Sequence, residues 1–268
     1  MYMPTCKTIQ DAASHGNLAD VQWYVQNGAD VNSKGGYTFT PLMGAASHGY
    51  LDVVKYLVDK GADVNIGRNC DSTPLMCAAY GGHLDVVIFL IGKGADIDAK
   101  DEHGQTPLIS VTRDGHLDLV KYLIDKGANI NAKDEKGYTP LLQAVFGHNL
   151  DVVKYLVHKG SCVNVDNTKD GETSLNRAAY DGKLDIVMFL VDKGADVNAK
   201  NKYGMTALHR AADTCKMDVI RYLLDKGLDV NAKNGYGETP LEQARKSGAD
   251  MTTKLGVVGF LKQYGAKE

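Results

Sequence analysis

The sequence has no long apolar run and no excess of one charge, and these two absences exclude several classes of protein. No stretch approaches the roughly 18–20 apolar residues that a membrane-spanning helix needs, and the opening residues MYMPTCKTIQ contain no apolar core of a signal peptide. The chain carries 30 Lys and Arg against 33 Asp and Glu, a net charge of -3. A protein held on nucleic acid by phosphate contacts needs a basic face. We therefore expect a cytoplasmic protein with no membrane and no nucleic-acid partner.

The sequence also lacks the motifs of disulfide frameworks, metal sites and common catalytic sites. The number of cysteines is odd and no two are spaced as CxxC, which argues against disulfides and against structural zinc. We expect reduced, mostly buried thiols at Cys6, Cys70, Cys77, Cys162 and Cys215. No GxSxG motif or phosphate-binding glycine loop is present, and no two histidines have metal-ligand spacing on one helix. We predict no enzyme activity, no cofactor and no metal.

Glycine and threonine recur with a fixed period. The recurring glycines lie 33 residues apart, or 34 in one case: Gly28, Gly61, Gly94, Gly127, Gly160, Gly194 and Gly227. A Thr-x-Leu motif, mostly Thr-Pro-Leu, keeps the same period and starts at Thr40, Thr73, Thr106, Thr139, Thr173, Thr206 and Thr239. Two markers in phase indicate tandem repeats. One such unit is too small to bury its own apolar face, so neighbouring units are expected to stack.

Each repeat is predicted to form two short antiparallel helices. In the second repeat, Thr40 suits an N-cap and Pro41 suits the first helical position, and Gly49 stops the first helix. The apolar positions 53, 54, 57 and 58 have helical spacing and predict a second helix, which the left-handed Gly61 ends. The residues from 63 to 73 are too rich in Gly, Asn and Asp for a helix and predict a turn or hairpin. Pairs such as Ala45-Ala46 predict close approach of neighbouring first helices.

The motifs Gly82-His83-Leu84, Gly115-His116-Leu117 and Thr206-Ala207-Leu208-His209 resemble the ankyrin repeat family, and the resemblance covers residues 5 to 265. It implies an all-α fold, a solenoid of paired antiparallel helices with β-hairpin loops. About eight repeats form a single domain over 1–268, at 5–33, 34–66, 67–99, 100–132, 133–166, 167–199, 200–232 and 233–266. The first and last are expected to be caps of a complete solenoid. An insertion at 249–254 is expected to precede the final helix.

Members of this family bind diverse proteins, and the resemblance implies that hairpin tips and first-helix ends on the concave face make the contacts. The candidates for partner binding are Tyr37, Phe39, His48, Tyr80, His103, Arg113, Tyr138, Phe146, Tyr180, Tyr203, Met205 and Tyr236. Tyrosine suits an interface because it brings a large area at low entropy cost and a hydroxyl group. The alternative is that these rings pack on neighbouring hairpins and stiffen the stack.

Other recurring residues have structural interpretations. A second aromatic row on the second helices is predicted to pack between repeats: Trp23, Tyr56, Phe89, Tyr122, Tyr155, Phe189 and Tyr222. The resemblance implies hydrogen bonds between loops and repeats for His83, His116 and His209. The irregular segment 160–176, which carries one extra residue, is interpreted as a tolerated hairpin insertion.

We predict a monomeric, non-enzymatic module that binds another protein. One alternative is a structural scaffold or spacer that contacts its neighbours through its caps or convex face. A further alternative is a bacterial effector delivered into a host cell, where it would act.

Overall fold

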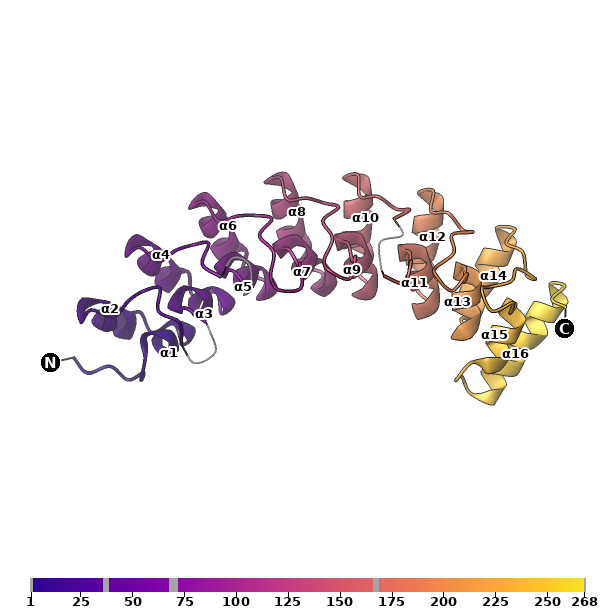
Figure 1. Ribbon diagram of the computed structural model, residues 1–268, viewed down its shortest axis with the longest axis horizontal. Helices are drawn as coiled ribbons and strands as arrows, with labels where there is room; N and C mark the ends of the chain where they lie inside the picture. Colours follow the sequence, from indigo (N-terminus) through magenta and orange to yellow (C-terminus); the bar gives the residue numbers. More distant parts are fainter. Residues whose placement is uncertain (1, 36–38, 68–71, 166–168, 268) are drawn as a thin grey trace. The chain divides into compact units, whose positions relative to one another are not determined.

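The computed structural model describes residues 2–35, 39–67, 72–165 and 169–267, and in these ranges the chain forms sixteen helices and no strand. Contacts divide the chain into two compact units. Unit 1 comprises Met1–Val111 and His116–Glu135, and unit 2 comprises Thr112–Gly115 and Lys136–Glu268. Figure 1 shows that both units consist of successive helix pairs. The helical part of the prediction is confirmed.

The helices alternate between a short first helix and a longer second helix of each pair. The first eight are α1 (Ile9–Ser14), α2 (Leu18–Gln26), α3 (Pro41–Ser47), α4 (Leu51–Asp59), α5 (Pro74–Tyr80), α6 (Leu84–Gly92), α7 (Pro107–Asp114) and α8 (Leu117–Asp125). The remaining eight are α9 (Pro140–Phe146), α10 (Leu150–His158), α11 (Ser174–Asp181), α12 (Leu184–Asp192), α13 (Ala207–Asp213), α14 (Met217–Asp225), α15 (Pro240–Lys246) and α16 (Met251–Gln263).

The first helices begin where threonine and proline predict. The Thr40 hydroxyl accepts a hydrogen bond from the Met43 N–H at 3.3 Å, and Pro41 occupies the first turn of α3. Such a cap stabilises a helix by about 1 kcal/mol. After the helix, Gly49 adopts a φ of +75°, and a Cβ atom there would lie 2.4 Å from Nδ1 of His83. Glycine is required at this position both for its backbone conformation and for the close approach of the next repeat.

First helices pack on first helices within each unit. The series is α1, α3 and α5 in unit 1, and α9, α11, α13 and α15 in unit 2. Ala45 and Ala46 are completely buried in α3. Pairs of first helices make more extensive contact than pairs of second helices. The alanine pairs therefore allow the close approach predicted for the first helices.

The second helices bury one apolar stripe. In α4 the side chains of Val53, Val54 and Leu57 have no exposed surface, whereas Val58 is half-buried. Full burial of such a side chain stabilises the fold by about 1.5–3 kcal/mol.

Asparagine side chains give a structural reason for the recurring Gly-Ala-Asp segments. In unit 1, Nδ2 of Asn65 donates to the Gly94 carbonyl at 3.0 Å, and its Oδ1 accepts from the Asp96 N–H at 2.8 Å. In unit 2, Asn164 makes the same two bonds to Gly194 and Asp196, both at 2.8 Å. Each of these asparagines thus ties its own repeat to the Gly-Ala-Asp of the next repeat. We call this arrangement the asparagine bridge.

The loops before the first helices are narrow hairpin-shaped turns without a strand in the described residues. The Asn201 N–H donates to the Met205 carbonyl at 3.0 Å and closes one such turn. Successive tips are also linked, because the Gly235 N–H donates to the Tyr203 carbonyl at 2.7 Å. The tips of one unit are therefore held at fixed spacing.

Six members of the aromatic row on the second helices contact a lysine at the end of their own helix. The ammonium of the lysine four residues later lies 5.7 Å from the ring centre of Tyr56 and 5.3 Å from that of Tyr222. The same pairing occurs at Phe89, Tyr122, Tyr155 and Phe189. These cation–π contacts lie within one helix, so the packing of the row between repeats stays a prediction.

The last helix begins earlier than expected. The residues 249–254 were expected to form an insertion before it, but α16 starts at Met251. Asp250 explains the difference, because its carboxylate accepts the Thr253 N–H at 3.0 Å and caps the helix.

Candidate functional site

In unit 1, the candidate contact residues at the loop tips and first-helix ends are exposed. Tyr80 has 72% of its surface exposed, and Phe39, His48 and His103 are exposed as well. Phe39 and His48 share the lining of a hollow of about 520 Å³ between α1 and α3. Tyr37 lies outside the described residues. The rings of unit 1 that are described are therefore available to a partner.

In unit 2, the candidate residues divide into exposed and half-buried groups. Tyr236 has 69% of its surface exposed, and Tyr203 and Arg113 are also exposed. Tyr203 and Tyr236 stack with their ring centres 6.3 Å apart. The rings of Tyr138, Phe146 and Tyr180 are half-buried.

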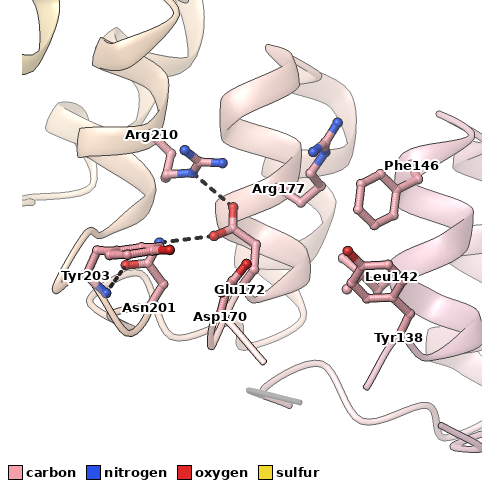
Figure 2. Close-up of a pocket in the computed structure, with 9 residues that line it drawn as sticks. All are labelled: Tyr138, Leu142, Phe146, Asp170, Glu172, Arg177, Asn201, Tyr203 and Arg210. Atoms are coloured by element: carbon pink, nitrogen blue, oxygen red, sulfur yellow. Dashed lines mark hydrogen bonds and ion pairs between the residues drawn. The ribbon is translucent and has the colours of Figure 1, made fainter. Parts of the chain in front are cut away.

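Three of the predicted residues meet in one pocket of unit 2. Tyr138, Phe146 and Tyr203 line a cavity of about 160 Å³. Figure 2 shows Tyr138 and Phe146 on one side of the view and Tyr203 on the opposite side. We call it the unit 2 pocket. Its lining is completed by Leu142, Asp170, Glu172, Arg177, Asn201 and Arg210.

Arginines and aromatic rings are layered beside this pocket. The guanidinium of Arg177 lies 4.2 Å from the ring centre of Phe146 and 5.4 Å from that of Tyr180. The guanidinium of Arg210 lies 4.1 Å from the Tyr180 ring. Part of the surface of Phe146 and Tyr180 is thus covered by the chain itself. For these two rings the packing interpretation is supported, and partner contact through their remaining exposed surface stays a prediction.

Ion pairs position the two arginines. Nε of Arg177 donates to Asp181 at 2.7 Å, and Nε of Arg210 donates to Glu172 at 2.9 Å. Glu172 also accepts from Nδ2 of Asn201 at 3.1 Å, and its side chain is only 13% exposed. Ion pairs shielded from water in this way are stronger than fully exposed ones.

Sequence reasoning missed both arginines of the pocket. They occupy the fourth position after the recurring threonine, where the other repeats carry Gly44, Cys77, Ser110, Gln143 and Gln243. A change from uncharged residues to arginine at that one position was the available signal.

The prediction for Met205 is wrong. Only 8% of its surface is exposed, so it cannot make the partner contact expected of it. Its N–H donates to Oδ1 of Asn201 at 3.0 Å and its carbonyl accepts from the Asn201 N–H, which fixes Met205 on the inner side of the turn. Tyr203, at the tip of the same turn, remains exposed.

A family model described as ankyrin repeats (3 copies) matches the chain three times, at residues 9–101, 94–167 and 162–234. The chain belongs to the ankyrin repeat family. Among solved structures it is similar to the crystal structure of the human ASB11 ankyrin repeat domain, with 26% identity and a TM-score of 0.73. The match covers 84% of this chain and 99% of that one. No curated protein matches this chain. Ankyrin repeat domains are generally protein–protein interaction modules.

The histidines of the ankyrin motifs have structural contacts here. Nε2 of His83 lies 3.1 Å from the Ser47 carbonyl, which joins neighbouring repeats. His209 is completely buried, and its Nε2 lies 3.0 Å from the Ala232 carbonyl. Burial lowers the pKa of His209 below its usual value. A neutral imidazole that holds a loop is therefore its role in this repeat.

The thiols are only partly as expected. Cys77 and Cys215 are buried, Cys6 is half-buried and Cys162 is exposed. Cys70 lies outside the described residues. Burial raises the pKa of Cys77 to about 12, so this thiol is unreactive. The described residues contain no group of His, Cys, Asp or Glu arranged to hold a metal ion, and none of their helices has the length and apolar character needed to cross a membrane.

Proposed function

We propose that this ankyrin repeat chain is a monomeric, non-enzymatic module that binds another protein through its hairpin tips and first-helix ends. The exposure of the rings of Tyr80, Tyr203 and Tyr236 supports the proposal most strongly. Large aromatic side chains are the usual hot spots of interfaces, where truncation costs about 2 kcal/mol or more. The thiols of Cys6, Cys77 and Cys215, which form no disulfide, favour action inside a cell, where cysteines stay reduced.

The test compares two sets of substitutions. One variant carries Tyr80→Ser, Tyr203→Ser and Tyr236→Ser. The matched control carries Ile88→Ser and Met188→Ser, which remove exposed apolar side chains from the second helices α6 and α12. Proteins cross-linked to the wild-type chain in an extract of its native cells are identified, and each is then purified for affinity measurement. We expect the tyrosine variant to bind at least about tenfold more weakly and the control to bind like the wild type.

The same variants address the scaffold alternative. Ile88 and Met188 are exposed on second helices, away from the tips, and a scaffold that used this face would depend on them. Light scattering that shows oligomers of the wild type, and monomers of the Ile88→Ser and Met188→Ser variant, would replace the proposal by the scaffold. A steep fall in melting temperature of the tyrosine variant would show that the rings stabilise the stack instead.

A further inference from the structure

Arg177 has hydrogen-bonding capacity that the chain does not use. Its Nε donates to Asp181, but its two terminal nitrogens have no hydrogen-bond or ion-pair partner among the described residues. A guanidinium carries five N–H donors, four of them on the terminal nitrogens. The side chain is 27% exposed and lines the unit 2 pocket. Arg177 thus presents an unused pair of donor groups at a partly sheltered position.

The carboxylates that line the same pocket are already paired. Glu172 accepts from Arg210 and Asn201. Asp170 pairs with Lys202, which holds the pKa of that lysine above its usual value. In Figure 2 the Glu172 side chain turns toward Arg210 and Asn201, and the Arg177 guanidinium lies on the side of Phe146. An incoming cation would have to displace one of these partners, whereas an anion would meet unpaired donors.

The guanidinium of Arg177 is also held in place. Phe146 stacks against it at 4.2 Å and Asp181 fixes its Nε at 2.7 Å. An arginine fork fixed in this way loses little further freedom when a planar acceptor binds to it. Carboxylate and phosphate both match the fork with two parallel bonds. Of the two, a carboxylate is planar and is carried by the unmodified side chains of a partner protein.

Building on the proposed function, we propose that the unit 2 pocket receives an acidic side chain, Asp or Glu, of the partner protein through Arg177. The rings of Tyr138 and Tyr203, which line the pocket, take an apolar residue next to that acid. The recognised segment is thus an acidic residue beside an apolar one.

The experiment uses the full chain and a phage-displayed library of random twelve-residue peptides. Enriched peptides are synthesised with a fluorescent label, together with versions in which each acidic residue is replaced by its amide. Binding is measured by fluorescence anisotropy to the wild type, Arg177→Gln, Arg177→Lys and Glu172→Gln. Arg221→Gln is the matched control, because Arg221 is an exposed arginine of unit 2 that lies 4.8 Å from the Phe260 ring, away from the pocket.

We expect the enriched peptides to contain an acidic residue beside an apolar one. Their affinity should fall about 10- to 100-fold with Arg177→Gln, less with Arg177→Lys, and not with Arg221→Gln. Glu172→Gln should leave the affinity unchanged or raise it. Melting temperatures show which variants are folded. If Arg177→Gln does not fold, the affinity of Arg177→Lys is used for the test.

Four results would overturn the inference. Peptides with no need for an acid, or an affinity that Arg177→Gln leaves unchanged, would show that the arginine is structural. Basic peptides weakened by Glu172→Gln would assign the pocket to a cation. A library that yields no binder would also count against it. If peptides lose affinity with the tyrosine variant but not with Arg177→Gln, the proposed function stands and this inference alone fails.

Discussion

Asn164 and Asn198 occupy equivalent places in neighbouring repeats, yet the structure assigns them different contributions to stability. Both are exposed and both follow valine. Asn164 makes the asparagine bridge, with two bonds at 2.8 Å. The side chain of Asn198 makes no hydrogen bond within the described part of the chain; only its backbone N–H is bonded, to Asp196 at 2.9 Å.

We predict that Asn164→Ala lowers the free energy of unfolding by about 1–2 kcal/mol, because two exposed hydrogen bonds each contribute roughly 0.5–1 kcal/mol net. Asn198→Ala should stay within about 0.5 kcal/mol of the wild type. Neither asparagine has a positive φ, so alanine adds no backbone strain at either position.

Urea unfolding followed by circular dichroism measures both variants. Hydrogen exchange adds a local measurement, because the Asp196 amide donates to Asn164 and should exchange about 5- to 30-fold faster in Asn164→Ala. Equal costs for the two substitutions, or unchanged exchange at Asp196, would refute the argument that the bridge stabilises the junction.

Two further predictions concern single side chains. Burial of the Asp20 carboxyl opposes its ionisation, but hydrogen bonds from Tyr2, Thr5 and Cys6 outweigh this and hold its pKa well below the usual range. Its contribution to stability is therefore full above the unfolded pKa of about 3.9 and is lost as the pH falls through the folded pKa. Asp20→Asn should lower the melting temperature at pH 7 and make the melting temperature decrease less steeply as the pH is lowered. His148 has a φ of 58° at a position where most other repeats place glycine, so His148→Gly should raise the free energy of unfolding by up to about 1 kcal/mol. A loss of stability measured by urea unfolding would show that the contact of His148 with Asp181 at 3.4 Å contributes more than the backbone strain costs.

The helices could be predicted because their signals are local. Thr40 and Pro41 start α3 where expected, since an N-cap needs only its own turn. Gly49 and Gly61 both adopt the left-handed conformation that was expected of a helix stop. The start of α16 was missed because the cap at Asp250 was interpreted as part of an insertion.

The pocket could not be predicted because its residues meet only after the repeats stack. Phe146 and Arg177 lie on successive first helices, and nothing in either repeat alone shows that they face each other. The burial of Met205 could not be predicted for a similar reason, because it depends on hydrogen bonds with Asn201 that orient the turn. The difference between Asn164 and Asn198 has no counterpart in their common Val-Asn dipeptide.

The asparagine bridge has a consequence for how such a chain changes length. The bridges at Asn65 and Asn164 each reach one repeat ahead and bind the same backbone groups, the carbonyl of a glycine and the amide of the second residue after it. Excision or duplication of a whole repeat next to such a junction would leave the bridging asparagine facing the same kind of backbone groups, those of another recurring glycine and the second residue after it. Recombination in a gene that encodes such junctions can therefore add or remove whole repeats while the contacts at each junction are kept.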